Sequence, residues 1–228
     1  MKNIFLFKDL QIIDYKKAWD FQKELFEQVL KSKNESETAN HKQYVLFCEH
    51  PHVYTLGKNG ERNNLLINDD FLKKIEATYF QIDRGGDITY HGPQQLVCYP
   101  IFNLESLKIS VKEYVYKIEQ SIIEMLREFS IESSRIGGAA GIWLDTNKLS
   151  PRKICAIGVK VSNLVTMHGF ALNVNTDLSY FNYINPCGFV DKGVTSLEKE
   201  LGHKVDFDKI KNLVKIKFAK TFGFEWSE

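Results

Sequence analysis

Residues 141–174 read GIWLDTNKLSPRKICAIGVKVSNLVTMHGFALNV. Three runs rich in β-branched and aromatic residues lie within this stretch, at 142–144, 154–161 and 167–174, and turn-forming residues separate them. No helical pattern lies between these runs, although a parallel βαβ arrangement would require one. The stretch therefore predicts strands that pair in a mixed or antiparallel sheet.

Amphipathic helices are expected on both sides of this strand region. Three apolar patterns with helical spacing each begin at a capping side chain: Asp14, Ser110 or Asp206. Glu113 completes a capping-box pattern with Ser110, and this helix is expected to run to about Phe129. The other short strands are predicted at residues 44–48, 53–56, 78–82 and 96–102.

Composition is that of one globular domain. The chain has 228 residues, of which 43% are hydrophobic and 13% aromatic, so it is long enough to bury a full core. No linker-like segment divides it. We expect a single domain over residues 1–228, with an α+β fold in which helices flank mixed or antiparallel sheets.

Charge and hydropathy exclude several classes of function. Lys and Arg number 30 against 29 Asp and Glu, so no overall field attracts nucleic acid or a membrane surface. Residues 1–10 lack the apolar core of a signal peptide, and no window approaches the ~18 apolar residues of a membrane span. A cytoplasmic protein is therefore expected.

The four cysteines are far apart in sequence and form no C-x-x-C pair. In a chain without a secretion signal this favours free thiols over disulfides or a zinc site. One of these thiols can therefore be a nucleophile. They are Cys48, Cys98, Cys155 and Cys187.

Residues 84–95, RGGDITYHGPQQ, are unusually rich in glycine. Glycine lets the backbone adopt positive φ or approach a ligand closely, while Arg84, Tyr90 and His91 supply polar groups and a ring. The segment suits a ligand-binding loop, and it equally suits a hairpin turn with solvated polar residues. It matches neither a Walker loop nor G-x-G-x-x-G, so nucleotide phosphate binding has no support.

Residues 185–188, NPCG, place the thiol of Cys187 between proline and glycine, on a segment expected to be a loop. Substrate can reach a nucleophile there, although a lone cysteine is also a common small core residue. A thiol with a pKa of ~8.5 needs a cation or base nearby to react at neutral pH. The candidates are His168, Lys153 and Lys160.

Several longer patterns follow one another between about residues 40 and 200. They comprise residues 84–86, 89–93, 95–97, 99–100, 153–158, 168–173, 177–178, 184–188 and 195–197. Together they resemble the lipoyl(octanoyl) transferases, which share a catalytic fold with biotin and lipoate protein ligases. Two positions depart from that family: Gln94 stands where glycine is usual, and Ala140 stands where proline is common.

The resemblance implies a Cys/Lys dyad of Cys187 and Lys153 and an acyl-substrate pocket, with no metal and no cofactor. The pocket residues that it implies are Arg84, Gly85, Gly86, Asp87, Ile88, Thr89, Tyr90, His91, Ala156, Ile157, Gly158, His168, Gly169, Phe170 and Ala171. The implied donor is octanoyl-acyl carrier protein. The implied acceptors are lipoyl domains of 2-oxoacid dehydrogenase E2 subunits and the glycine cleavage H protein.

Alternatives to that reaction remain open. An amidotransferase that moves octanoyl between two lipoyl domains would also use a cysteine, whereas an ATP-dependent lipoate or biotin ligase needs none. A non-catalytic acyl-binding module would keep the pocket alone. Cys155 competes with Cys187 for the nucleophile's role, and because residues two apart in a strand share a face, Cys155 is expected to line the pocket beside Lys153. Carrier docking is expected at a local basic patch, with Arg62, Lys108, Lys112 and Arg152 as candidates.

Overall fold

A computed structural model describes residues 3–33, 41–185 and 193–227. Within these residues an eight-stranded sheet has the order β1-β2-β6-β10-β9-β8-β7, and β11 pairs with β9 off this path. Its strands are β1 (Asn3–Ile12), β2 (His41–Glu49), β6 (Gln95–Ile101), β7 (Ser134–Ile136), β8 (Ala139–Leu144), β9 (Arg152–Ser162), β10 (Val165–Asn173) and β11 (Gly193–Val194). The β1–β2 and β9–β11 pairs are parallel and the others antiparallel, so the expected mixed sheet is confirmed.

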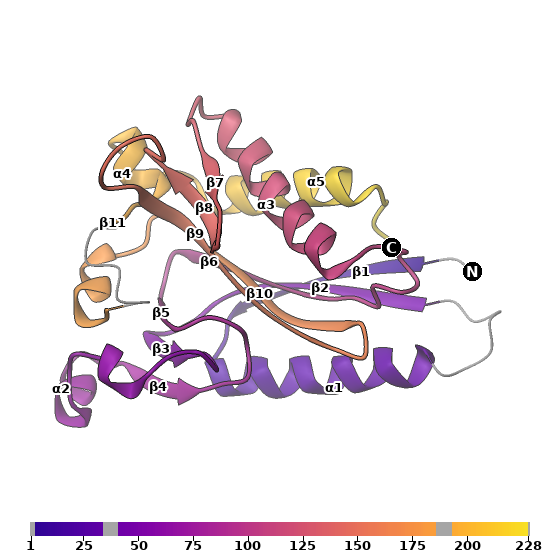
Figure 1. The fold of residues 1–228 in the computed structure, drawn as a ribbon, viewed down its shortest axis with the longest axis horizontal. Helices are drawn as coiled ribbons and strands as arrows, with labels where there is room; N and C mark the ends of the chain where they lie inside the picture. Colours follow the sequence, from indigo (N-terminus) through magenta and orange to yellow (C-terminus); the bar gives the residue numbers. More distant parts are fainter. Residues whose placement is uncertain (1–2, 34–40, 186–192, 228) are drawn as a thin grey trace.

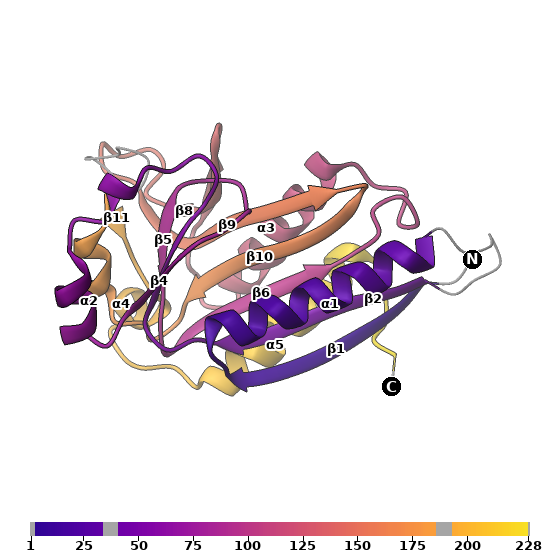
Figure 2. The same ribbon diagram turned by 90° about the horizontal axis from the view of Figure 1, so that it is seen from below.

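Helices cover both faces of this sheet. In Figure 1, α1 (Tyr15–Lys33) lies below the sheet, and α3 (Val111–Arg127) and α5 (Phe207–Phe222) lie above it. Figure 2 shows α1 crossing the opposite face from α5. Alternation along β2 explains both layers, because Val45 and Phe47 join the core under α3 and α5, whereas Leu46 and Cys48 join the core under α1.

The three predicted helix caps are confirmed. The side chain of Asp14 accepts a hydrogen bond from the Lys17 N–H, and those of Ser110 and Asp206 accept from the N–H groups three residues on. Each cap satisfies a backbone donor that the first helical turn leaves unpaired. No helix in the described ranges is long and apolar enough to cross a membrane.

A small second sheet stands at one end of the molecule, with the order β4-β3-β5. Its strands are β4 (Thr78–Gln81), β3 (Val53–Leu56) and β5 (Ile88–His91), and the short elements nearby are η1 (Arg62–Asn64), α2 (Asp69–Lys74), η2 (Leu178–Tyr183) and α4 (Leu197–Leu201). β5 lies inside the glycine-rich segment 84–95, so neither a loop nor a hairpin turn describes that segment fully. Residues 88–91 pair in register with β3, and only residues 84–87 form the loop before them.

Candidate active site

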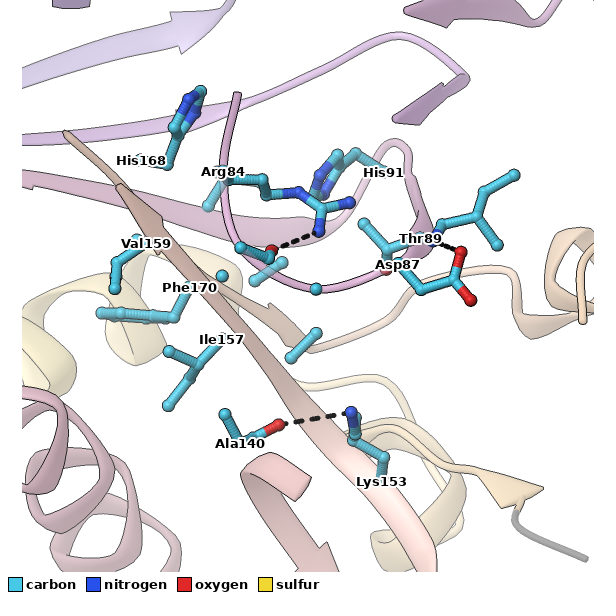
Figure 3. Close-up of a pocket in the computed structure, with 18 of the residues that line it drawn as sticks. Arg84, Asp87, Thr89, His91, Ala140, Lys153, Ile157, Val159, His168 and Phe170 are labelled. Atoms are coloured by element: carbon cyan, nitrogen blue, oxygen red, sulfur yellow. Dashed lines mark hydrogen bonds between the residues drawn. The ribbon is translucent and has the colours of Figure 1, made fainter. Parts of the chain in front are cut away.

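A cavity of about 440 Å³ lies between the β9–β10 hairpin and the loop before β5 (Figure 3). The structure brings most of the expected substrate residues together around it, and their roles stay predictions. Those that line it are Arg84, Gly85, Gly86, Asp87, Ile88, Thr89, His91, Lys153, Ala156, Ile157, Gly158, His168, Gly169, Phe170 and Ala171.

Tyr90 is an expected pocket residue that does not line this cavity. Its ring is fully buried in the core of the small sheet, where its hydroxyl lies 2.7 Å from Nδ1 of His52 and its ring stacks on Tyr180. Strand alternation is the reason, since a residue between Thr89 and His91 points to the opposite face of β5.

The cavity also has lining residues beyond the pocket residues that the resemblance implied. They come from α1, β6, α3, the β7–β8 and β9–β10 hairpins and the segments on either side of residues 186–192. The additional lining residues are Tyr15, Gln95, Val97, Tyr99, Val115, Gly138, Ala139, Ala140, Trp143, Val159, Asn173, Phe181, Ile184, Gly193 and Val194. In the sequence, Tyr15 and Val115 belong to apolar patterns with helical spacing, which predict core residues of a helix. No local pattern would therefore have assigned them to a site.

The loop of residues 84–87 is fastened to both sheets. Nη2 of Arg84 donates to the carbonyl and hydroxyl oxygens of Thr55 on β3, at 2.8 and 3.0 Å. The Gly85 N–H donates to the Val159 carbonyl on β9 at 3.0 Å. A Cβ on Gly158 would lie 2.9 Å from Cδ of Arg84, so glycine is needed where the loop crosses β9. Arg84 therefore helps to hold this loop over the cavity.

His91 is held by a buried amide network. Its Nδ1 lies 2.8 Å from Oε1 of Gln95, whose Nε2 donates to Oδ1 of Asn173 at 2.9 Å. Asn173 in turn donates to the Thr195 carbonyl at 2.9 Å. Because Gln95 presents an acceptor, Nδ1 of His91 carries the proton. Burial, reinforced by nearby His50, lowers the pKa of His91 to about 3, so this imidazole is neutral at pH 7.

The buried His168 has a half-buried hydrogen-bond partner, Asp83. Its Nε2 lies 3.0 Å from Oδ1 of Asp83, and Nζ of Lys160 donates to the other carboxylate oxygen at 2.6 Å. Burial lowers the pKa of His168, and the bond to Asp83 opposes that effect only in part. The hydrogen bond from His168 and the ion pair with Lys160 lower the pKa of Asp83. Lys160 is thus committed to Asp83, which weakens it as a partner for a thiol.

Lys153 lies toward the opposite end of the cavity from His168 (Figure 3). Its Nζ donates to the Ala140 carbonyl at 3.3 Å and sits 4.5 Å from the centre of the Trp143 ring. On the other side, β11 pairs Val194 with Lys153, and the Thr195 N–H donates to the Lys153 carbonyl at 3.0 Å. β8 and β11 therefore place the ammonium group at a cavity wall.

The expectation that Cys155 shares a face with Lys153 is wrong. Ile142 of β8 pairs with Cys155, but the next residue, Trp143, pairs with Lys153, so Ile154 is the extra residue of a β-bulge. The bulge breaks the two-residue alternation, and both Ile154 and Cys155 point into the main core with no exposed surface. Burial also raises the pKa of the Cys155 thiol.

Cys48, Cys98 and Cys155 are buried free thiols, and free thiols were expected in place of disulfides. Cys187 lies within residues 186–192, outside the described residues. On either side of that segment, Ile184 and Gly193 both line the cavity that Lys153 lines.

Residues 14–219 match the catalytic domain of lipoyl protein ligases A and B. The chain belongs to the lipoyl protein ligase A/B catalytic domain family. Within this family, it is 51% identical over 220 residues to the octanoyltransferase of Bacteroides thetaiotaomicron, covering 96% of this chain and 95% of that protein. The expected acyltransferase class is therefore confirmed.

Solved structures of lipoate and biotin protein ligases share the fold. A bi-partite lipoate protein ligase from Thermoplasma acidophilum superposes with a TM-score of 0.72 at 14% identity, over 99% of this chain and 86% of that one. A biotin protein ligase from Aquifex aeolicus in complex with biotin and ATP gives 0.52 at 13% identity, over 97% and 70%. The expected relation to both ligase folds is confirmed.

Proposed function

We propose that this acyltransferase carries an octanoyl group on Cys187, taken from octanoyl-acyl carrier protein, and passes it to a lysine of a lipoyl domain in the cytoplasm. The observation that carries the proposal is the position of Lys153, whose ammonium group is fixed at the wall of a largely apolar cavity. The octanoyltransferase name of a relative at 51% identity over nearly the whole chain supports the acyl group.

In the first half-reaction the Cys187 thiolate attacks the thioester carbonyl of the donor. The new C–S bond forms as the bond to the carrier's sulfur breaks, and the leaving thiolate takes a proton from Lys153. A protonated Lys153 favours the attacking thiolate before this step by proximity of charge. It is left neutral afterwards.

In the second half-reaction the neutral Lys153 acts as the general base. An ordinary lysine amine has a pKa of ~10.4, so the acceptor arrives mostly protonated and must lose that proton to solvent. As the amine attacks the thioester carbon, Lys153 takes its remaining excess proton and the Cys187 thiolate leaves. The amide is formed and the starting charge pair is restored.

Water exclusion decides whether the acyl-enzyme yields amide or free acid. Val97, Ile157, Phe170 and Ala171 supply apolar surface in the cavity, and the neutral His91 and His168 add no ionised group. A wall of this kind holds an acyl chain and keeps bulk water from the reacting carbonyl.

Donor docking is part of the proposal, and the structure separates the basic candidates. Arg152 is committed to Asp145 and Glu200, with N–O distances of 2.6 and 2.5 Å, which reduces its value for attracting an acidic carrier. Arg62 pairs with Asp69 at 2.8 Å on the surface, and Lys108 and Lys112 are exposed. We therefore favour Lys108 and Lys112 as the first positions to test.

The test is intact-mass spectrometry of the protein mixed with octanoyl-carrier protein and no ATP. We expect an octanoyl adduct that hydroxylamine removes and that maps to Cys187, followed by octanoyl transfer when an apo-lipoyl domain is added. An absolute need for ATP and free octanoate would establish a ligase instead. Octanoyl supplied only by a second lipoyl domain would establish an amidotransferase.

The acyl-binding alternative is tested in the same mixture. A non-catalytic module would bind octanoyl-carrier protein without forming a covalent adduct. Thiol alkylation at Cys187 with no loss of transfer would overturn the role of that residue.

A further inference from the structure

One peptide group, that between Ala140 and Gly141, touches both Lys153 and a buried acid. Its carbonyl oxygen accepts from Nζ of Lys153 at 3.3 Å, and its N–H donates to Oε1 of Glu119 at 3.3 Å. Glu119 is on α3 and is distant in sequence from the Ala140–Gly141 peptide and from Lys153. The peptide therefore connects the carboxylate to the ammonium group.

Other contacts fix the side chain of Glu119 beside the Gly141 N–H. Its side chain is 10% exposed, and its second oxygen accepts from Nε of Arg135 on β7 at 2.8 Å. Arg135 also donates to Oε1 of Gln120 at 2.9 Å and stacks over the ring of Tyr116. A nearly buried carboxylate persists only with such compensation.

Gly141 has a backbone that other residues would not adopt here. Its φ is +127°, and a Cβ at this position would lie 2.5 Å from the Cys155 carbonyl oxygen. Glycine therefore lets β8 approach β9 closely beside the bulge, with its N–H turned to Glu119. The contact with Lys153 depends on this arrangement of the peptide.

We infer that Glu119 is a positioning residue for Lys153, acting through the Ala140–Gly141 peptide. A carboxylate that accepts from a peptide N–H polarises that peptide and makes its carbonyl oxygen a stronger acceptor. The stronger acceptor favours the protonated amine and holds it above Trp143. The inference rests on the proposed function, in which Lys153 must first be protonated and then return to that state.

Other charged groups lie near Lys153. Among the described residues, they include Glu119 and Arg135, Asp145, Arg152 and Glu200, and Arg84 and Asp87. Arg152 is neutralised by Asp145 and Glu200 in a separate ion network. Of these side chains, Glu119 is the one that bonds to the Ala140–Gly141 peptide.

The test compares Glu119→Gln with Glu124→Gln on the same helix. Glu124 pairs with Arg127 at 2.6 Å and also accepts from Nε2 of Gln120 at 2.6 Å, so its variant removes a neighbouring charge on α3 but leaves the bond between Glu119 and the Gly141 N–H in place. The readout is competitive acylation of Lys153 against pH, quantified by mass spectrometry in the full-length protein. Only the unprotonated amine reacts, so the midpoint of the curve reports its protonation.

We expect the midpoint for Lys153 to move to lower pH by about half a unit in Glu119→Gln and to stay at the parental value in Glu124→Gln. If Glu119→Gln does not fold, the double variant Glu119→Gln/Arg135→Gln also removes the guanidinium that has lost its carboxylate, and it is measured instead. The same direction is expected, because the Gly141 N–H has again lost its charged acceptor. An unchanged midpoint in the folded variant overturns the inference.

Octanoyl transfer measured in parallel separates this inference from the proposed function. If Glu119→Gln transfers octanoyl at the parental rate and the midpoint for Lys153 is unchanged, only the role of Glu119 is refuted. A protein that shows the shift but never forms an acyl-enzyme would refute the proposed function and leave the electrostatic link intact.

Discussion

Oε2 of Glu49 accepts a hydrogen bond from the backbone N–H of Gln94 at 2.6 Å. Gln94 has a φ of 61°, in the left-handed region that favours glycine, the residue usual at this position in the family. The departure at Gln94 therefore keeps the backbone that glycine would adopt. Bonds to the Gln94 carbonyl from Asn175 and Thr176 help to hold it.

This geometry predicts that two substitutions at Gln94 differ in their effect on stability. Gln94→Gly relieves the φ strain but loses the side-chain bond from Asn175, so we expect stability within about 1 kcal/mol of the parent. Gln94→Val puts a β-branched side chain at positive φ and should cost about 1–3 kcal/mol. Urea denaturation of both variants checks this. A valine variant as stable as the glycine variant would contradict the left-handed backbone.

The crossing of the 84–87 loop over β9 predicts sensitivity at Gly158. In Gly158→Ala the new methyl group meets Cδ of Arg84 and the Gly85 carbonyl, so the loop must move away from β9. We expect a loss of about 1–3 kcal/mol in stability and slower acyl loading. Gly137→Ala is the matched control, because a Cβ there has no neighbour within 4 Å. Equal behaviour of the two variants would show that the loop does not need this contact.

Buried neutral histidines predict that stability falls with pH below neutrality. Burial lowers the pKa of His50 to about 4 and that of His91 to about 3, against ~6.5 in an unfolded chain. Below pH 6.5 the unfolded state binds protons that the folded state does not, so the free energy of unfolding decreases as pH falls towards 4. The slope approaches roughly 1.4 kcal/mol per pH unit for each histidine.

Denaturant titrations between pH 7.5 and 4.5 measure this slope. His91→Gln keeps a donor for Gln95 and removes one titrating group. The free energy of unfolding should therefore depend less steeply on pH, and at pH 7.5 it should differ less from the parental value than it does at pH 4.5. A slope that is unaffected by His91→Gln would mean that this histidine takes up its proton in the folded state.

Lys153 has two proposed roles that Arg can separate. Lys153→Ala should slow both acyl loading and transfer, since it removes the cation and the base. Lys153→Arg keeps the charge but does not deprotonate, so we expect it to load better than the Ala variant and to accumulate acyl-enzyme. Loss of a general base costs ~10²–10⁴-fold in the transfer step.

Single-turnover mass spectrometry distinguishes loading from transfer in these variants. Parental transfer by Lys153→Arg would remove Lys153 from the base role. His168 would then be the next residue to test, although its Nε2 is already bonded to Asp83.

Locally encoded features of this protein were correctly predicted from sequence. The caps at Asp14, Ser110 and Asp206 and the strands β9 and β10 follow from side chains within a few residues of each other, because capping and periodicity act at short range. The order of the family's segments likewise indicated the acyltransferase class, which the comparisons support.

Long-range pairing decided what local patterns missed. β1 was not predicted, and β5 was hidden in a glycine-rich segment whose residues 88–91 become a strand only by pairing with β3. The bulge at Ile154 exists only against β8, and it turns Cys155 into the core although its spacing from Lys153 implied a shared face. The contact of Glu119 with the peptide beside Lys153 joins α3 to β8, and no period of 2 or 3.6 residues encodes such a meeting.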